Sequence, residues 1–188
     1  MTAPTVSTLN GVDVQQLVDT INAIKENPEL ARFTFQAHNR WLGGGHSQTQ
    51  IQTFYHAGRE DSSRRTPFTL EGDEPPVLLG QNAGPNAVEA VLHALASCLA
   101  VGFIYNAAAQ GIKVDQLEFD IEGDLDLHAF LGLSDEVRPG YENITLTYRV
   151  KSDAPRRQLE QLCEYVQRTS PVVDIIRNPV PVSIELEV

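Results

Sequence analysis

The chain has 188 residues, of which 41% are hydrophobic and 21% charged, and its formal net charge is −11. This length and composition suffice for one globular domain with a single hydrophobic core. Because binding to phosphate groups depends mainly on Lys and Arg, the acidic balance argues against nucleic acid and anionic membranes as partners. The polar start Met1–Pro4 contains no basic segment followed by an apolar run, so no signal peptide is expected and a cytoplasmic location is predicted.

A helix and a hairpin are the first elements predicted. Apolar residues at helical spacing predict an amphipathic helix over residues 11–27, beginning after Asn10. Two alternating runs, residues 33–37 and 51–55, lie on either side of Gly43-Gly44-Gly45 and predict a β-hairpin.

A long apolar helix is predicted at the centre of the chain, after a segment rich in charge, Ser and Pro (residues 58–76) that is expected to be a surface excursion. The helix spans Ala87–Ala109, with Pro85 and Asn86 at its start and Gly111 just past its end. It is long enough to cross a bilayer, but it contains side chains that hydrocarbon would penalise, namely Glu89, His93, Ser97 and Asn106. We therefore interpret it as the central helix of a soluble core.

The C-terminal half combines strand and helix patterns. Residues 117–122 and 144–150 alternate apolar and polar side chains and predict two half-buried strands. A helix is expected after the cap Asp153, a short helix after Ser170-Pro171, and a final strand over Val180–Val188. The predicted fold class is therefore α+β, without βαβ alternation or internal repeats.

Cys98, in the middle of the apolar helix, is the main candidate for chemistry. A buried free cysteine usually packs as a small hydrophobic residue, so reactivity requires a cation or a hydrogen-bond donor supplied from elsewhere. Cys163, the second cysteine, lies on the apolar face of its own helix and has the same two interpretations. The five histidines show no metal-ligand spacing and Gly43–Gly45 lacks the residues of a phosphate-binding loop, so neither a metal nor a cofactor is expected.

Two blocks of sequence carry a family resemblance. The first runs from Asn86-Ala87-Val88-Glu89 to Ala94-Leu95-Ala96-Ser97-Cys98, and the second comprises Ser170-Pro171-Val172 and Asn178-Pro179-Val180-Pro181-Val182. In these blocks the chain resembles the OsmC and organic hydroperoxide resistance (Ohr) family. The resemblance extends over residues 32–188, the predicted OsmC-like domain, and leaves residues 1–31 as an N-terminal amphipathic helix extension.

The resemblance implies an OsmC-like fold, in which long central helices pack between antiparallel sheets in an intertwined homodimer. In redox-active members, one cysteine attacks the peroxide oxygen and becomes a sulfenic acid, and a second cysteine closes a disulfide that an external dithiol reduces. Cys98 matches the attacking cysteine, whereas Ser170 stands where the family has its second cysteine. Cys163 lies seven residues earlier and is the remaining candidate for a resolving thiol.

The resemblance also implies an arginine that lowers the pKa of the attacking thiol and a glutamate that positions this arginine. Glu89 is the candidate glutamate, one position nearer to the cysteine than the family spacing, where Val88 stands in this chain. Arg65, before the central helix, and Arg40, beside Trp41, are the candidates for the arginine. The predicted catalytic set is therefore Cys98, Glu89 and Arg65.

The predicted function is the thiol-dependent reduction of organic hydroperoxides, with a small thiol or Cys163 resolving the oxidised Cys98. The expected partners are a second copy of the chain, an organic hydroperoxide and a thiol reductant. Because the second family cysteine and a clear arginine are missing, the alternative is a noncatalytic protein that binds a small hydrophobic ligand at the dimer interface. A third hypothesis is a structural dimer that acts through the helix at residues 11–27.

Overall fold

The computed structural model describes residues 8–188, which divide into two compact units. The first unit comprises the described residues up to Val14 together with Leu92–Val188, and the second comprises Gln15–Val91. Helices and antiparallel sheets occur together along the chain, which confirms the predicted α+β class. The predicted start of the chain and part of the predicted extension, residues 1–7, lie outside the described residues.

The first unit is organised around the long helix α2 (Ala87–Ala109), whose bounds match the prediction. Leu95, Leu99, Phe103 and Ala107 recur every fourth residue, so their side chains form a buried row along one face of the helix. By length and composition, α2 is the one helix of residues 8–188 that is apolar enough to cross a membrane. The buried row instead belongs to a protein core, as expected for a central core helix.

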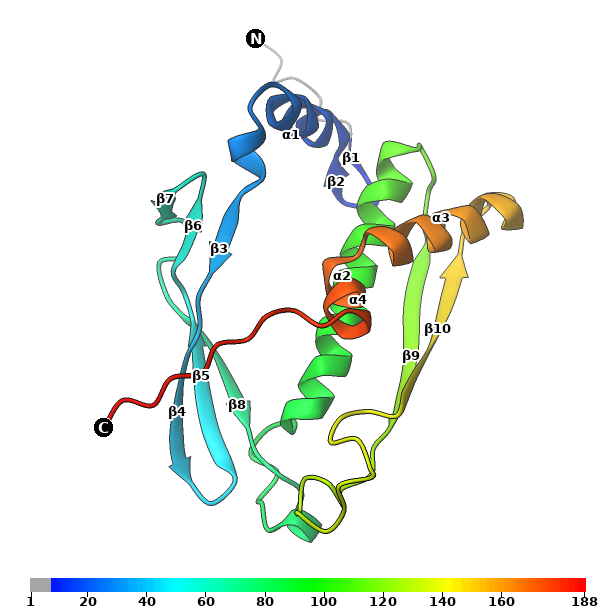
Figure 1. The fold of residues 1–188 in the computed structure, drawn as a ribbon. Coiled ribbons are helices and arrows are strands. Elements are labelled where there is room, and N and C mark those ends of the chain that lie inside the picture. The colour runs from blue at the N-terminus through cyan, green and yellow to red at the C-terminus, as the bar shows by residue number, and fades with distance from the viewer. Residues whose placement is uncertain (1–7) are drawn as a thin grey trace. The chain divides into compact units, whose positions relative to one another are not determined.

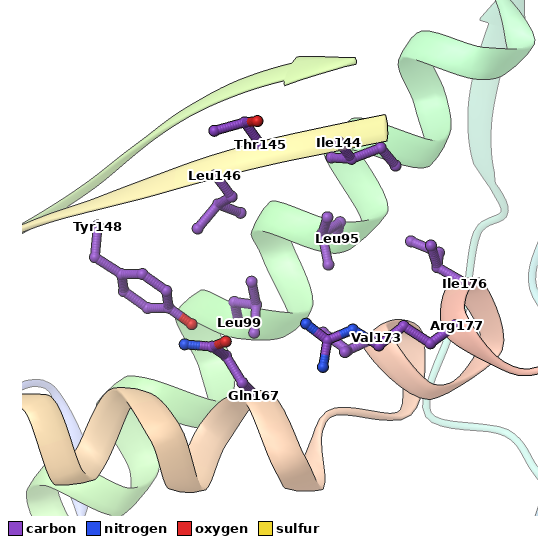
Figure 2. Close-up of a pocket in the computed structure, with 10 residues that line it drawn as sticks. All are labelled: Leu95, Leu99, Ile144, Thr145, Leu146, Tyr148, Gln167, Val173, Ile176 and Arg177. Atoms are coloured by element: carbon purple, nitrogen blue, oxygen red, sulfur yellow. The ribbon is translucent and has the colours of Figure 1, made fainter. Parts of the chain in front are cut away.

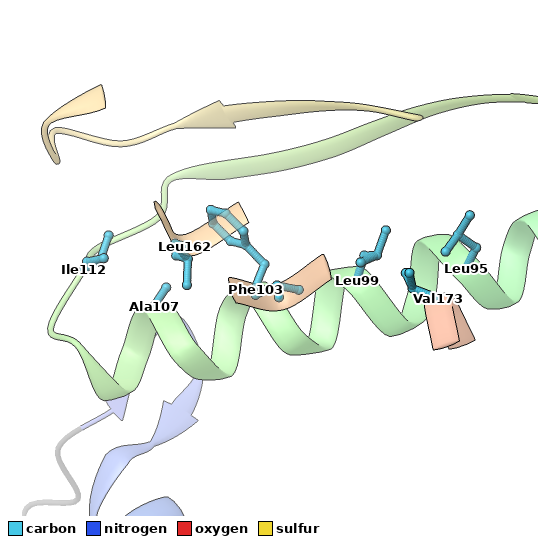
Figure 3. Packing of buried hydrophobic residues seen from close by; sticks show 8 residues of the cluster. Leu95, Leu99, Phe103, Ala107, Ile112, Leu162 and Val173 are labelled. Carbon is cyan, nitrogen blue, oxygen red and sulfur yellow. The ribbon is translucent and has the colours of Figure 1, made fainter. Parts of the chain in front are cut away.

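Two long strands cover this row. β9 (Gln116–Asp124) and β10 (Asn143–Lys151) pair antiparallel over their full length. Both strands alternate exposed and half-buried side chains, because successive side chains of a strand point to opposite faces. The inward residues pack against the core cluster, and Figure 3 shows the buried row of α2 on the side that faces these strands. The predicted pair of half-buried strands is therefore confirmed.

Two helices complete the core of the first unit (Figure 1). α3 (Arg156–Thr169) buries Leu162 and Val166, and α4 (Pro171–Arg177) buries Val173. A Cβ atom added at Gly102 of α2 would lie 2.9 Å from Cγ1 of Val166, so the absence of a side chain there permits this close packing.

Two predicted helix starts have different outcomes. Asp153 does not cap α3, because Pro155 occupies the N-cap position and makes no side-chain capping bond. The predicted start of α4 is confirmed, since the Ser170 side chain caps this helix. Proline at or before the first turn is tolerated because the first N–H groups of a helix have no partner within it.

A small hairpin, which the sequence reasoning missed, precedes the first helix. β1 (Thr8–Leu9) and β2 (Val12–Asp13) pair around Asn10 and Gly11, whose φ angles of 55° and 78° are those of a tight hairpin turn. The Asn10 side chain donates to the carbonyl of Ile112 (2.8 Å) and accepts from the N–H of Val114 (2.9 Å). These two bonds attach the hairpin to the segment that follows α2.

The helix that follows is α1 (Val14–Glu26), and a short 3-10 helix (Pro28–Ala31) comes next. The predicted helix over residues 11–27 is confirmed in its body and wrong at its start, because the Asn-Gly turn occupies the residues before Val14. The predicted domain boundary after residue 31 stays a prediction.

The second unit contains two three-stranded antiparallel sheets. The hairpin predicted around Gly43–Gly45 is present as β4 and β5, but the predicted strands at residues 33–37 and 51–55 correspond mainly to β3 and β6, which also pair with each other. The surface excursion predicted over residues 58–76 is largely exposed, but it contains the strands β7 and β8, which were not predicted. Strand pairing uses backbone groups, so the polar composition of this segment concealed it. One sheet has the order β3-β6-β7 and the other β4-β5-β8, with β3 Phe33–Phe35, β6 Phe54–His56, β7 Arg59–Asp61, β4 His38–Gly43, β5 His46–Ile51 and β8 Phe68–Gly72.

A buried carboxylate holds the segment after β8, which includes the 3-10 helix Pro76–Leu78. Asp73 accepts hydrogen bonds from the backbone N–H groups of Glu74 (2.8 Å), Gln81 (2.9 Å) and Ala83 (3.0 Å). These bonds lower the pKa of the Asp73 carboxyl, because they stabilise its charged form. The carboxylate therefore supplies hydrogen-bond acceptors for backbone N–H groups that no strand or helix pairs in this irregular segment.

The final strand predicted over Val180–Val188 does not form in the described chain. The alternating apolar pattern is present, but its side chains remain in solvent, with Ile184 90% and Leu186 87% exposed. A β-ladder needs a second strand for its backbone hydrogen bonds, and no described strand pairs with this segment.

Candidate active site

Cys98 lies next to the buried row of α2, between Leu95 and Leu99, and its thiol is half-buried. Its Sγ atom lies 3.1 Å from the hydroxyl Oγ of Ser170. The sequence reasoning had matched both residues to the two cysteine positions of one family. The structure brings these two positions into contact, although they are 72 residues apart.

Ser170 is buried and its orientation is determined by α4. Its Oγ accepts a hydrogen bond from the backbone N–H of Val173 at 3.2 Å, as an N-cap residue does. With this acceptor bond made, the hydroxyl hydrogen remains available for the sulfur of Cys98. A thiolate carries no hydrogen, so in the ionised state of Cys98 only Ser170 can be the donor. The pair thus combines a thiol with a hydroxyl group that can donate a hydrogen bond to its ionised form.

Glu89 has a structural role at the start of α2. Its carboxylate Oε2 accepts from the backbone N–H of Asn86, and Asn86 Oδ1 accepts from the backbone N–H of Glu89, both at 2.8 Å. This reciprocal arrangement is a capping box, which satisfies two N–H groups that the helix leaves without partners. Glu89 precedes Cys98 by nine residues of one helix, a rise of about 13 Å.

The candidate arginines belong to the second unit. Arg65 lies between β7 and β8 and Arg40 lies on β4, and both are exposed. The sequence reasoning missed the neighbouring Arg64, whose guanidinium lies over the rings of Phe54 (4.8 Å) and Phe68 (5.5 Å). Its Nη1 atom is buried and has no hydrogen-bond partner among the described residues. A paired Arg-Arg sequence contains no local signal that distinguishes the half-buried residue from the exposed one.

Cys163 is a half-buried free thiol on α3. Burial raises its pKa, and the nearby carboxylates of Glu160 and Glu164 add to this effect, because both disfavour the thiolate. Neither cysteine forms a disulfide in the described chain. The environment of Cys163 therefore favours the neutral and less reactive form of the thiol.

Tyr148 connects the surroundings of the two cysteines. Burial raises the pKa of its hydroxyl, and negative charge on the thiols of Cys163 and Cys98 adds to this effect. The hydroxyl oxygen is buried and has no hydrogen-bond partner among residues 8–188. The strand pattern had identified Tyr148 only as an inward-facing core residue, because periodicity carries no information about a hydroxyl group.

A pocket of about 380 Å³ opens beside this hydroxyl (Figure 2). Its walls come from α2, β10, α3 and α4, all elements of the first unit. Leu95 and Leu99, the neighbours of Cys98 in the buried row, form part of the lining. The complete lining consists of Leu95, Leu99, Ile144, Thr145, Leu146, Tyr148, Gln167, Val173, Ile176 and Arg177.

The fold is that of one protein family. Residues 80–185 match the family described as OsmC-like protein, and this match covers more than half of the chain. It includes α2 with Cys98, both long strands, and α3 and α4 with Ser170. The chain therefore belongs to the OsmC-like protein family, as the resemblance predicted.

Solved structures support the fold assignment. An OsmC-like protein from Mycoplasma pneumoniae is 14% identical, with a TM-score of 0.59 over 78% of this chain and 89% of that one. An OsmC-like protein of unknown function from Vibrio cholerae is 15% identical, with a TM-score of 0.55 over 75% and 92%. An organic hydroperoxide resistance protein OsmC from Legionella pneumophila is 16% identical, with a TM-score of 0.52 over 77% and 89%. No curated protein matches this chain in sequence.

Proposed function

We propose that this protein reduces organic hydroperoxides with Cys98 as the peroxidatic nucleophile. The observation that carries the proposal is the 3.1 Å contact between Cys98 Sγ and the Ser170 hydroxyl, whose oxygen accepts from the Val173 N–H and whose hydrogen can be donated to the sulfur. A hydrogen bond to a charged group stabilises that group by about 1.5–3 kcal/mol. Ser170 would therefore favour the thiolate, which is the reactive form of cysteine.

The proposed reaction has three steps. The Cys98 thiolate attacks the terminal oxygen of the hydroperoxide, the O–O bond breaks, and the alkoxide takes a proton and leaves as an alcohol. Cys98 is now a sulfenic acid, oxidised by two electrons. An external thiol attacks its sulfur and releases water, and a second thiol then cleaves the mixed disulfide and restores Cys98.

The resolving step distinguishes this chain from a two-cysteine enzyme. Ser170 lies in contact with Cys98 but cannot form a disulfide. The raised pKa of Cys163 makes this thiol a poor nucleophile. We therefore assign resolution to an external thiol reductant in place of an internal cysteine.

The proposal can be tested by measuring how fast the reduced full-length protein consumes cumene hydroperoxide in the presence of dithiothreitol. Cys98→Ser should abolish turnover, whereas Cys163→Ser should retain it. Ser170→Ala should lower the rate by about tenfold to a hundredfold, which corresponds to the loss of one hydrogen bond to a thiolate. Equal rates for the original protein and Cys98→Ser would reject the proposal.

A variant that can form a disulfide tests the contact between positions 98 and 170 separately. Ser170→Cys places a thiol where the Ser170 hydroxyl contacts Cys98, so one equivalent of hydroperoxide should produce a disulfide between residues 98 and 170. Peptide mass spectrometry detects this bond as the loss of two hydrogens. A sulfenic acid that persists at Cys98 in this variant would show that the two positions do not meet in solution.

The roles of Glu89 and Arg65 are part of the proposal. Arg65 would supply positive charge to the Cys98 thiolate, and Glu89 would position this arginine while it also caps α2. Arg65→Gln should then slow the alkylation of Cys98 by iodoacetamide at neutral pH, because a thiolate without its cation is less populated. Arg40→Gln is the matched variant for the second candidate arginine. An effect of Arg40→Gln alone would transfer the role from Arg65 to Arg40.

The alternative is a noncatalytic protein that binds a small hydrophobic ligand, and the pocket lined by Leu95 and Leu99 of α2 supports it. Rapid and selective alkylation of Cys98 at neutral pH would count against this alternative. Slow alkylation at Cys98 together with a hydrophobic ligand retained through purification would favour it over peroxide reduction.

We also infer that the protein works as a homodimer. In this dimer, a second copy of the chain would supply the strand partner that the C-terminal segment lacks. Val182, Ile184 and Leu186 alternate with polar residues and are at least 74% exposed, so they form an unpaired strand face. Such a segment gains backbone hydrogen bonds when it joins the edge of another sheet. Ile184→Asp should weaken the dimer in light scattering after size exclusion, whereas Glu185→Gln, on the opposite side of the segment, should not. A monomer in both the original protein and Glu185→Gln would contradict the inference.

A further inference from the structure

The pocket on the first unit is lined by polar and apolar groups that have no role in the proposed reaction of Cys98. Its volume of about 380 Å³ lies in the lower part of the range for small-ligand sites. Six of the ten residues that line it are aliphatic, so an apolar chain would gain by leaving water for them. The aliphatic side chains are Leu95, Leu99, Ile144, Leu146, Val173 and Ile176.

Four polar side chains also line the pocket: Thr145, Tyr148, Gln167 and Arg177. Figure 2 shows the polar ends of Tyr148, Gln167 and Arg177 directed into the pocket and that of Thr145 directed away from it. The Tyr148 hydroxyl is buried without a hydrogen-bond partner among the described residues. Each of the three inward-directed groups can donate a hydrogen bond, and Arg177 adds a permanent positive charge. The polar end of the pocket therefore presents donors and a cation, but no carboxylate.

Arg177 is available for a ligand. It takes part in none of the ion pairs found among residues 8–188. The carboxylate of Asp174, one turn earlier on α4, accepts instead from the side-chain amide of Asn178 at 2.8 Å. In a chain with a net charge of −11, a free guanidinium at the edge of an apolar pocket selects for an anion.

We propose that this pocket binds an aliphatic monocarboxylate. The hydrocarbon chain would pack on the six aliphatic side chains, and the carboxylate would accept from Arg177, with the Gln167 amide and the Tyr148 hydroxyl as further donors. This assignment places a ligand within the first unit and does not depend on the redox chemistry of Cys98. It predicts that affinity depends on both the negative head and the length of the chain.

Isothermal titration of the reduced full-length protein tests this assignment with three probes of equal chain length: decanoate, decanol and decylamine. We expect decanoate to bind at least tenfold more tightly than decanol, and decylamine to bind most weakly, because Arg177 repels it. Shortening decanoate to octanoate should weaken binding by about fourfold for each methylene removed. None of these probes contains an O–O bond, so the result is separate from the test of peroxide reduction.

Variants identify the residue responsible. Arg177→Gln should remove the preference for decanoate over decanol, while Arg168→Gln should keep it, because Arg168 stacks on Tyr165 (5.6 Å) and is not part of the pocket lining. Tyr148→Phe should weaken decanoate binding to a smaller extent. Equal affinity of the original protein for decanoate and decanol, or equal losses in Arg177→Gln and Arg168→Gln, would overturn the proposal.

Discussion

The two compact units of this chain differ in how their side chains are buried. All nine buried hydrophobic residues of the described chain lie in the unit built around α2. In the unit that contains β3 to β8, Asp73 is the one buried side chain among the described residues. The first unit is thus stabilised by a hydrophobic core, and the second by backbone ladders and polar contacts.

Large apolar side chains are nevertheless present in the second unit. Phe35 is 67% exposed and Trp41 is 72% exposed, and both lie on strands. Exposed aromatic residues on a sheet commonly mark a surface that another protein covers. The comparison teaches that, among the described residues, only the first unit builds a buried hydrophobic core, although both units leave large apolar side chains exposed, such as Val101 (53%) and Phe130 (76%) in the first unit.

The largest effect is expected from a core truncation. Phe103 is fully buried, so Phe103→Ala should lower the free energy of unfolding by about 3–5 kcal/mol, from lost burial and the cavity left behind. The matched variant in the other unit is Phe35→Ala, which should cost about 1 kcal/mol or less, since Phe35 contacts mainly the rings of Phe33 and Phe54. Urea unfolding at several protein concentrations measures the change in free energy of unfolding for both variants. A large loss for Phe35→Ala that does not depend on protein concentration would break the comparison.

A smaller loss of stability is expected from a substitution of Asp73, the buried carboxylate of the second unit. Asp73→Asn keeps the size of the side chain but removes the charge that three backbone N–H groups stabilise. Because the pKa of Asp73 is lowered in the native state, its contribution is complete above the ordinary aspartate pKa of about 3.9 and is lost as the pH falls through the native pKa. The urea midpoints of the two proteins should therefore differ at pH 7 and converge toward pH 3. A constant difference across this range would show that the charge of Asp73 is not responsible.

The next largest change in stability is expected at the N-terminal cap of α2. Variants of Glu89 there also distinguish its capping role from its proposed role in positioning an arginine. Glu89→Ala should destabilise the protein by about 1 kcal/mol, because one N–H group at the helix start loses its acceptor. Glu89→Gln should be nearly neutral, since an amide oxygen can accept the same bond. Hydroperoxide turnover provides the second readout. A loss of activity in Glu89→Gln at unchanged stability would support the proposed positioning of an arginine, and unchanged activity would limit Glu89 to capping.

The smallest effect is expected at Tyr148. Its hydroxyl is buried without a described partner, so Tyr148→Phe should leave stability unchanged or raise it by up to about 1 kcal/mol. Thermal unfolding measures this change. Phe119→Leu provides a reference for ordinary repacking, because the ring of Phe119 contacts that of Tyr148 at 4.8 Å. A clear destabilisation by Tyr148→Phe would mean that the hydroxyl has a bound partner, such as an ordered water.

Much of the first unit could be predicted from the sequence. The bounds of α2 follow from an apolar run between Pro85-Asn86 and Gly111, and β9 and β10 follow from strict alternation. These signals are local, since each depends on residues within one element. The match of Cys98 and Ser170 to one family also came from the sequence, although it contained no information about their separation.

The errors arose where an element depends on a partner. β7 and β8 lie in a segment rich in charge, Ser and Pro, and they form by pairing with β6 and β5, so composition alone predicts a surface excursion there. The segment Val180–Val188 shows the reverse case, because its strand pattern is clear and its partner is absent from the described chain. The start of α1 was misplaced for a local reason, since the Asn10-Gly11 turn signal was read as a helix start.

The sequence by itself determined the core helix, the long strand pair and the position of the cysteine on which the proposed chemistry depends, because apolar periodicity and helix punctuation act over a few residues. Only the tertiary structure decided that the Ser170 hydroxyl contacts Cys98 and that Arg177 and Tyr148 share one pocket. These contacts join residues from separate elements, and their geometry depends on how α2, α3, α4 and β10 pack together. Directed hydrogen bonds and free charges arise from that packing, and no pattern within a single element specifies them.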